Sequence, residues 1–300
     1  EIIVPEPEKL NLEPENIPID IIYEDDDVLV AVCNAAEMGI VEPILVGDKK
    51  KIKEIADAHN LNVEKYEMIE KIDLNEAARA AVELVSSGKA DFVMKGLIDT
   101  SILLKAVLDK EIGLRTDSLL SHVMVYKVPT YHKLLFLTDG GMNIAPSLEE
   151  KAMIIKNVIR VAKSMGIDDV KVACLAAKEK VSPKMIATVE ADKLKEMGNN
   201  GEFGEGVIVE GPLAFDLAVS KEAADIKKFE SKVAGDTDVL LVPTIEVGNG
   251  IGKALTYMAN AESAGIIMGA KAPVVLVSRA DSHQAKLNSI ALGSVVAAYK

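Results

Sequence analysis

The chain has 300 residues, of which 49% are hydrophobic and only 4% aromatic, and its formal net charge is −13 at pH 7. This length exceeds the usual size of one hydrophobic core and predicts two domains, while the aliphatic composition favours an α/β fold over an all-β one. The negative charge argues against nucleic acid and anionic membranes as partners, and no apolar run is long enough to span a bilayer. Cys33 and Cys174 match no zinc or redox spacing, so we expect buried free thiols in a cytoplasmic protein.

The first half of the chain alternates between strand and helix patterns after a segment rich in Pro and Glu. Residues 1–20 form that segment, and we expect either an N-terminal arm or a disordered leader there, to which no function is assigned. Helices are predicted at residues 49–60, 75–88 and 100–111, and a buried strand at residues 90–94. The strand ends at Lys95-Gly96, and Asp99 is the predicted N-cap of the third helix.

The second half begins with two consecutive strand patterns, residues 122–128 and 133–137, which predict a hairpin or an edge pair. Further along, we predict helices at residues 148–165 and 183–197, strands at 170–176 and 207–209, and a turn at 210–212. Residues 239–282 then predict a strand, a glycine-rich turn, a helix and a second strand, before a final helix over residues 282–299.

The most informative strand end follows the apolar run at residues 274–277. The run stops abruptly at Ser278, Arg279 and Asp281, and the free N–H groups of the following helix should point into the same space. A hydroxyl, a guanidinium and a helix N-terminus together predict an anion site. The alternative interpretation makes Arg279 part of a structural ion pair, with Asp281 and Ser282 as helix caps.

Two further segments suit a phosphate-bearing ligand, and each also has an ordinary explanation. Lys95-Gly96 either offers a lysine and a backbone donor to phosphate or forms a plain turn between strand and helix. The sequence GNGIGK at residues 248–253 is not a Walker loop, because three residues rather than four precede its Gly-Lys pair and Ala254 follows. We expect a backbone-exposing turn that presents Asn249 and Lys253 to a ligand or simply closes a tight connection.

Other polar residues are more typical of structural roles. Asp139 and Asp216 follow predicted strand ends in glycine-containing segments and are typical of turn-forming carboxylates. The four histidines show no metal-ligand spacing, so no metal site is predicted. His283 is either a proton acceptor beside Asp281 or an exposed helix residue.

Six motifs, taken in order, resemble those of one known family. They are KGLIDTS at residues 95–101, LRTDSLLSHV at 114–123, TDGGMN at 138–143, EGPLAFD at 210–216, PTIEVGNGIGK at 243–253 and GAKAPVVLVSRADS at 269–282. From about residue 28 to its end, the chain resembles the phosphate acetyltransferase and phosphate butyryltransferase family. PTIEVGNGIGK and the helix sequence KLNSIAL are more similar to the butyryl branch than to the acetyl branch.

The resemblance implies an α/β fold with two three-layer αβα domains, of the isocitrate and isopropylmalate dehydrogenase type, and an active site in the interdomain cleft. We expect the first domain at residues 1–127 with 281–300, because the C-terminal helix would return to it, and the second at residues 128–280. The family also implies a homo-oligomer, a dimer or larger.

The implied reaction converts butyryl-CoA and phosphate into butyryl phosphate and CoA, reversibly and by direct transfer in a ternary complex. Coenzyme A is then a substrate, and no tightly bound cofactor or metal is implied. Attack on the thioester passes through a tetrahedral oxyanion, so the site needs cations for phosphate, a donor for the oxyanion and a base for the thiol. Phosphate acetyltransferase activity is the alternative within the family.

Matching residues to the family motifs assigns roles to named positions. Arg279 would hold phosphate and Ser278 would hydrogen-bond the reacting carbonyl or its oxyanion. Further phosphate or substrate contacts would be Lys95, Gly96, Arg115, Ser121 and Asp216, and contacts to CoA would be Thr244, Asn249 and Lys253. In the acetyl branch an aspartate lies six positions after the arginine, where this chain has Ala285. We therefore expect Asp281 to be the base, with His283 and Asp216 as alternatives.

Two functions of other classes stay open on the sequence. A metal-dependent hydroxyacid dehydrogenase would share the fold but would need a cluster of metal-binding aspartates and a nicotinamide site, and neither is apparent. A non-catalytic CoA-binding protein would keep the glycine-rich turn yet tolerate the loss of Ser278 or Arg279. The acyl chain preferred by an enzyme would depend on pocket packing that one methylene can alter.

Overall fold

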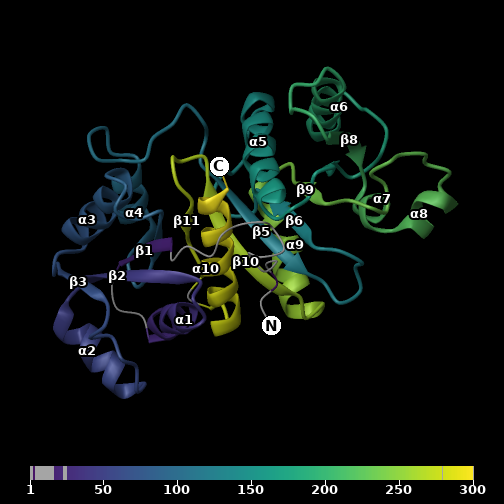
Figure 1. Cartoon of the computed structure of the whole chain (residues 1–300). Coiled ribbons are helices and arrows are strands. Elements are labelled where there is room, and N and C mark those ends of the chain that lie inside the picture. Colours follow the sequence, from purple (N-terminus) through teal and green to yellow (C-terminus); the bar gives the residue numbers. More distant parts are fainter. Residues whose placement is uncertain (1–2, 4–16, 23–25, 279, 300) are drawn as a thin grey trace. The chain divides into compact units, whose positions relative to one another are not determined.

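The computed structural model describes residue 3 and residues 17–22, 26–278 and 280–299. The chain forms two compact units, Glu1–Ser118 with Ala264–Lys300 and Leu119–Ser263. In each unit, helices flank a sheet of mainly parallel strands, which confirms the predicted α/β class (Figure 1). Among the described residues, no helix is both long enough and apolar enough to cross a membrane.

The sheet of the first unit has the strand order β3-β2-β1-β4-β11-β10. The parallel strands are β1 (Ile17–Ile22), β2 (Val41–Gly47), β3 (Glu67–Glu70), β4 (Phe92–Lys95) and β11 (Val274–Val275); β10 (Glu262–Met268) is antiparallel to β11. The helices are α1 (Asp26–Glu37), α2 (Lys49–Ala58), α3 (Leu74–Ser86), α4 (Thr100–Val107) and α10 (His283–Ala298). Figure 1 shows α3 and α4 on one side of these strands and α1 and α2 on the other.

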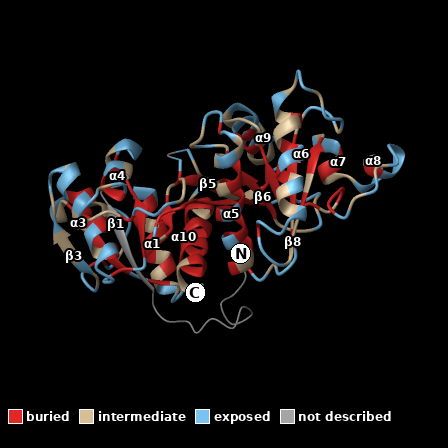
Figure 2. Ribbon diagram, turned by 90° about the horizontal axis from the view of Figure 1, so that it is seen from above, coloured by how far each residue is buried: buried red, intermediate tan, exposed pale blue. Residues whose placement is uncertain are grey.

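Local sequence explains where several of these helices begin and which of them is central. Asp48 and Asp73 cap α2 and α3, each accepting hydrogen bonds from two backbone N–H groups of the first turn. Helix α10 is buried continuously from Ala285 to Val296, as Figure 2 shows. Gly293 permits close packing there, because a Cβ atom would lie 2.7 Å from Val275 Cγ2 and 2.9 Å from Phe92 Cε2. Helix α10 therefore forms part of the core of this unit.

The predicted arm over residues 1–20 is wrong for residues 17–20, which belong to a strand. Residues from Ile17 onward form β1, which pairs with β2 on one side and β4 on the other. The high Pro and Glu content of the whole segment favoured an arm. Its isoleucine-rich end forms a strand because it pairs with β2 and β4, which come later in the sequence. Residues 4–16 of the expected arm lie outside the described residues.

The sheet of the second unit has the strand order β5-β6-β9-β7-β8. The strands are β5 (Ser121–Lys127), β6 (Leu135–Thr138), β7 (Val170–Leu175), β8 (Val207–Leu213) and β9 (Val239–Leu241), and the helices are α5 (Leu148–Ser164), α6 (Ile186–Asn199), α7 (Phe215–Val219), α8 (Lys221–Ile226) and α9 (Ile245–Met258). β5 and β6 are antiparallel, with Met124 opposite Leu137, which confirms the predicted hairpin. β6, β9, β7 and β8 are parallel neighbours.

The observed units differ from the expected domain boundaries of 1–127 with 281–300 and 128–280. Residues 119–127 belong with the second unit because β5 pairs with β6, and residues 264–280 belong with the first because β11 pairs with β4. Sequence periodicity locates strands but not their partners, and the partners decide which unit a segment joins.

Three local predictions in the second half of the chain are wrong. Residues 210–212 lie within β8, an outer strand of its unit, where a proline disturbs only one ladder. The segment GNGIGK lies inside α9 rather than in a turn. Helix α9 ends at Met258 and β10 begins at Glu262, so residues 239–282 contain one strand more than the two predicted there.

Candidate functional site

The carboxyl ends of β4 and β11 lie side by side at one edge of the first unit. The two strands are parallel, with Val93 opposite Val274 and Met94 opposite Val275. This register places Lys95-Gly96 beside the residues that lead from β11 to Ser278. In open α/β sheets, ligands bind outside this edge. The structure therefore brings together two of the segments that the sequence analysis singled out.

The segment from Ser278 to Asp281 forms a turn closed by hydrogen bonds in both directions. Ser278 N–H donates to Asp281 Oδ2 over 2.8 Å, and Asp281 N–H donates to the Ser278 carbonyl over 3.0 Å. Ala280 N–H donates to Ser278 Oγ over 3.3 Å, so the hydroxyl acts as an acceptor within the turn and keeps its own proton for another partner. Ser278 is exposed and Asp281 is half-buried. Arg279 lies outside the described residues.

Helix α10 begins directly after this turn and is joined to it by a hydrogen bond from Lys286 to the Asp281 carbonyl. Ser282 is its N-cap and accepts a hydrogen bond from Ala285 N–H. Lys286 is only 1% exposed, yet its ammonium donates to the Asp281 carbonyl over 2.9 Å and to Asp27 Oδ2 on α1 over 3.3 Å. A buried ammonium so close to the turn adds positive charge at this edge. Lys286 also restrains the position of Asp281.

Lys95 is held at the same edge by the loop that follows β4. The side chain is 6% exposed, and Nζ donates to the carbonyls of Gly96 over 3.1 Å and Ile98 over 2.9 Å. These bonds fix the loop that leads into α4. Lys95 thus shapes the edge through its backbone contacts, and its predicted contact with phosphate stays a prediction.

The structure does not bring Arg115 to Lys95 and Ser278. Its neighbours in the chain are fixed near the turn between β10 and β11: Lys271 N–H donates to the Leu114 carbonyl, and Thr116 Oγ1 donates to the Gly269 carbonyl. That turn precedes β11, whereas Ser278 follows it, so the two positions lie at opposite ends of the strand. Arg115 is exposed there.

In the second unit, two predicted substrate contacts have other partners. Ser121 at the start of β5 is fully buried, and its Oγ accepts a hydrogen bond from Asn157 Nδ2 over 2.8 Å. Asp216 in α7 is exposed, and its Oδ2 lies 2.8 Å from Lys227 Nζ. The hydrogen bond from Lys227 lowers the pKa of Asp216, which keeps the carboxylate ionised. The role of Asp216 as an alternative base stays untested.

A buried aspartate organises the loop that follows β6. Asp139 is 2% exposed, and its carboxylate accepts hydrogen bonds from the backbone N–H groups of His122, Gly141 and Met142 and from Asn143 Nδ2. The structure gives Asp139 this organising role, in accordance with the interpretation of a turn-forming carboxylate. The loop packs directly against α9, where Gly140 faces Gly248.

The predicted contacts to CoA lie on the first three turns of α9. Thr244 is the N-cap, and Asn249 and Lys253 are exposed and one helical turn apart. Gly248 faces the Asp139 loop, where a Cβ atom would lie 2.6 Å from Gly140 Cα. The glycine therefore lets helix and loop approach each other, and Asn249 and Lys253 are presented by a helix instead of the expected turn.

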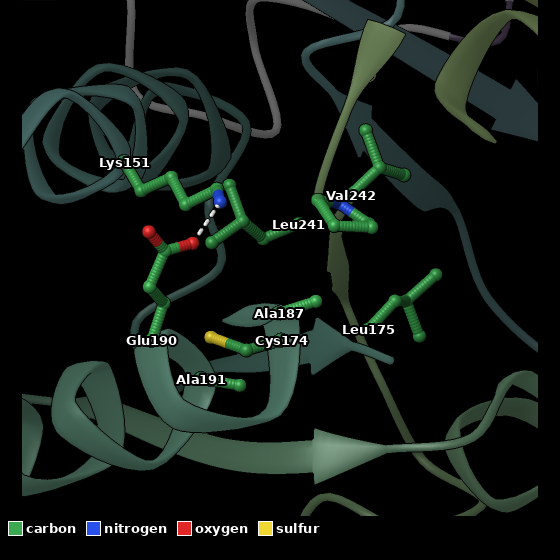
Figure 3. A pocket seen from close by; sticks show the side chains of 9 residues that line it. Lys151, Cys174, Leu175, Ala187, Glu190, Ala191, Leu241 and Val242 are labelled. Carbon is green, nitrogen blue, oxygen red and sulfur yellow. Dashed lines mark hydrogen bonds and ion pairs between the residues drawn. The ribbon is translucent and has the colours of Figure 1, made fainter. Parts of the chain in front are cut away.

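A small pocket lies at the carboxyl ends of β7 and β9. Figure 3 shows Lys151 on α5 paired with Glu190 on α6 over 2.5 Å, beside Cys174. The pocket has a volume of about 10 Å³, close to the space that one water molecule needs. Burial raises the pKa of the Cys174 thiol to about 12, so the thiol stays protonated. The pocket is too small for a substrate.

Comparison with known proteins identifies the family of this chain. Residues 67–294 match the family described as "Phosphate acetyl/butaryl transferase". The chain belongs to this family. Phosphate butyryltransferase of Clostridium acetobutylicum is 46% identical over 279 residues, which are 93% of this chain and 92% of that protein. A probable phosphate butyryltransferase of Bacillus subtilis is 48% identical over 269 residues, covering 90% of this chain and 89% of that protein.

Other relatives and solved structures extend the comparison. Phosphate acetyltransferase of Rhizobium meliloti is 41% identical over 274 residues, 91% of this chain and 86% of that protein. The crystal structure of a branched-chain phosphotransacylase from Enterococcus faecalis V583 matches with a TM-score of 0.82 and 35% identity, covering 93% of this chain and 99% of that one. A 4-hydroxythreonine-4-phosphate dehydrogenase from Burkholderia phymatum matches with a TM-score of 0.55 and 15% identity, which shows a shared fold alone. The chain is therefore an enzyme, a phosphate acyltransferase.

Lys286 is a residue of this candidate site that the sequence analysis did not predict. The sequence motifs assign no role to Lys286, yet this residue is buried at the edge that holds Ser278 and Asp281. A lysine within the apolar sequence of a buried helix was the available signal, because such a charge requires a partner. No group of three or more His, Cys, Asp or Glu side chains is placed to hold a metal ion in the part of the chain that the structure describes.

Proposed function

We propose that the enzyme transfers a butyryl group reversibly between CoA and phosphate, converting butyryl-CoA and phosphate into butyryl phosphate and CoA. The observation that carries this choice is the similarity to three proteins named as established or probable phosphate butyryltransferases, at 46%, 45% and 48% identity over at least nine tenths of this chain. Two proteins named phosphate acetyltransferase are 41% and 44% identical over 91% of it. The butyryl motif at residues 243–253 points the same way.

The reaction would proceed by direct transfer in a ternary complex at the edge formed by β4 and β11. A phosphate oxygen attacks the thioester carbonyl carbon, the carbonyl oxygen becomes an oxyanion, and the C–S bond then breaks to release CoA. Ser278 suits the oxyanion, because its hydroxyl accepts the Ala280 N–H and still has a proton to donate. Arg279 would hold the phosphate, with Lys95 and Lys286 adding positive charge close by.

In the reverse direction a base must take the proton of the CoA thiol. Asp281 is the proposed base, because Ser278 N–H fixes one of its oxygens at 2.8 Å and leaves the carboxylate oriented. Lys286 holds the Asp281 carbonyl and so acts as a positioning residue. Asn249 and Lys253 on α9 are the proposed contacts to CoA, and their helical spacing places them on one exposed face.

The first experiment measures release of free thiol from butyryl-CoA and from acetyl-CoA, with and without phosphate, in the presence of a chelator. Faster phosphate-dependent release from butyryl-CoA supports the proposal, and faster release from acetyl-CoA replaces it with phosphate acetyltransferase. If neither thioester releases thiol although CoA binding is demonstrated separately, the proposed activity is wrong and a non-catalytic CoA-binding role takes its place.

The proposed base has a matched test. Asp281→Asn keeps the shape of the side chain and should lower kcat for the CoA-dependent direction by about 10²-fold, the usual contribution of a positioned base. The control is Asp225→Asn, an exposed carboxylate on α8 that pairs with Lys221 one helical turn away. Equal kcat values for Asp281→Asn and the native enzyme would reduce Asp281 to a turn-forming residue.

A further inference from the structure

Helix α1 packs directly against α10, whose N-terminus follows the turn from Ser278 to Asp281 (Figure 2). The side of α1 that contacts α10 carries Asp27 and Asn34, which are seven residues and so about two helical turns apart. Ala31 lies between them by helical spacing and is fully buried. Two polar side chains therefore flank a closely packed position between the helices.

Both polar side chains form hydrogen bonds to the first turns of α10. Lys286 Nζ donates to Asp27 Oδ2 over 3.3 Å, and Asn34 Nδ2 donates to His283 Nε2 over 3.1 Å. The two partners on α10 are three residues apart and share one side of that helix. Helix α1 is thus joined to the beginning of α10 at two points.

The contact between Asp27 and Lys286 joins an exposed carboxylate to a buried ammonium. The side chain of Lys286 is 1% exposed, whereas that of Asp27 is 66% exposed. A buried ammonium requires polar partners, and Lys286 donates both to Asp27 and to the Asp281 carbonyl, which is 2.9 Å away. Without the Asp27 carboxylate, the Asp281 carbonyl is the one partner left to this ammonium among the described residues. The position of the Lys286 nitrogen therefore depends on Asp27.

The exposure of Asp27 separates an effect on rate from an effect on stability. Its carboxylate already lies largely in water, and ion pairs with an exposed partner contribute little to folding stability. A small displacement of a catalytic group, in contrast, can slow a reaction strongly. Loss of this carboxylate should therefore lower the rate more than the stability.

We propose that Asp27 is a positioning residue for acyl transfer. Through Lys286 it fixes the Asp281 carbonyl, and with it the side chain that serves as the base; this inference rests on the proposed function. Asp27 acts through Lys286 and does not touch the substrate. Asn34, through His283, holds the beginning of α10 at a second point.

The neighbouring residue in the chain provides a matched control. Asp26 also lies in the first turn of α1 and is 62% exposed, but it pairs with His59 at the end of α2 over 3.1 Å. Asp26→Ala and Asp27→Ala remove the same charge from the same helix N-terminus. A difference between these two variants therefore reports on the contact with Lys286.

Steady-state kinetics and urea unfolding test the proposal together. Asp27→Ala should lower kcat about 10-fold relative to Asp26→Ala, with KM for butyryl-CoA and for phosphate within about twofold and with equal unfolding midpoints. Asp27→Asn keeps an oxygen that accepts a hydrogen bond and should recover most of the lost kcat. Because both residues act on one carbonyl, Lys286→Met combined with Asp27→Ala should be no slower than Lys286→Met alone.

Three results would overturn the proposal. Equal kcat values for Asp26→Ala and Asp27→Ala would show that the contact has no effect on the reaction. Losses of kcat that multiply when Asp27→Ala is combined with Lys286→Met would show that Asp27 acts independently of Lys286. A lower kcat in Asp27→Ala that comes with a lower unfolding midpoint would make its role structural.

Chemical modification of the lysines tests the contact without any activity. Reductive methylation with formaldehyde and cyanoborohydride, followed by peptide mass spectrometry, should modify Lys286 faster in Asp27→Ala than in Asp26→Ala, because the ammonium loses the partner that covers it. If the native protein releases no thiol from either thioester, the proposed function fails, and this difference still supports Asp27 as the residue that holds Lys286. Equal modification of Lys286 in the two variants overturns the inference, whether or not the native protein is active.

Discussion

Replacing Gly250 by Ala should stabilise the second unit, whereas replacing Gly248 by Ala should destabilise it. Both residues lie in α9, so both substitutions gain the same helix propensity, about 0.5 to 1 kcal/mol. A Cβ atom at Gly250 would meet nothing within 4 Å. One at Gly248 would lie 2.6 Å from Gly140 Cα, 2.8 Å from Val242 Cγ2 and 3.0 Å from the Asp139 carbonyl oxygen. The shared propensity cancels, and the difference between the variants measures packing alone.

The clash at Gly248 involves backbone that cannot easily move away. Asp139 holds its loop through hydrogen bonds to the backbone of His122, Gly141 and Met142, so a retreat of Gly140 would disturb them. Overpacking of this kind costs about 1 to 3 kcal/mol. Since the helix gain is common to both variants, Gly248→Ala should be about 1 to 3 kcal/mol less stable than Gly250→Ala.

Urea unfolding followed by far-UV circular dichroism gives the difference directly. With slopes of about 1 to 3 kcal/mol per molar urea, the two unfolding midpoints should differ by roughly 1 M. Gly250→Ala should unfold at a higher urea concentration than the native enzyme. If Gly248→Ala is as stable as Gly250→Ala, α9 does not pack against the Asp139 loop as described, and the explanation of the buried glycine is wrong.

Three further predictions concern charge and burial. Lys286→Met should lower kcat about 10-fold or more while KM for butyryl-CoA stays unchanged, because it loosens Asp281 without touching the proposed contacts to CoA; an unchanged kcat in steady-state assays would refute the positioning role. Burial raises the pKa of Asp236, but hydrogen bonds from neighbouring lysine and histidine side chains outweigh it and hold that pKa below its usual range. Its contribution to stability is therefore present above the unfolded-state pKa of about 3.9 and is lost as the pH falls further, so Asp236→Asn should flatten the acid side of a plot of stability against pH. Burial also raises the pKa of Cys33 to about 11 and of Cys174 to about 12, so iodoacetamide at about pH 8 should label both in urea and neither in the folded enzyme; rapid labelling of the native protein would contradict the burial.

Much of the candidate site followed from the sequence because its chemistry is local. An apolar strand that ends abruptly on Ser278 and Asp281 places these groups at a sheet edge whatever the strand pairs with, and the N-cap of the next helix is encoded by Ser282 itself. The six motifs identified the family because they come from six separate segments of the chain and occur in the family's order. The hairpin of β5 and β6 was likewise predictable, since its two strands are adjacent in the chain.

Residues far apart in the sequence decided the rest. Arg115 looked like a neighbour of the site, but hydrogen bonds from residues 269–271 place its loop at the other end of β11. Lys286 became part of the site through contacts with Asp27 and the Asp281 carbonyl. Asp216 pairs with Lys227, a partner that lies eleven residues further along the chain. In each case the partner that matters could not be read from the neighbouring sequence.

The sequence by itself determined the alternation of helix and strand, the polar strand ends and the family, because periodicity, capping and turn chemistry act over a few residues. Only the tertiary structure decided that GNGIGK is helical and that residues 17–22 are a strand. Glycine costs a helix up to about 1 kcal/mol per residue, so local preference favours a turn at residues 248–253. Close packing of Gly248 on Gly140 overrides that preference. In the same way, β1 becomes a strand because β2 and β4, which come later in the chain, pair with its backbone.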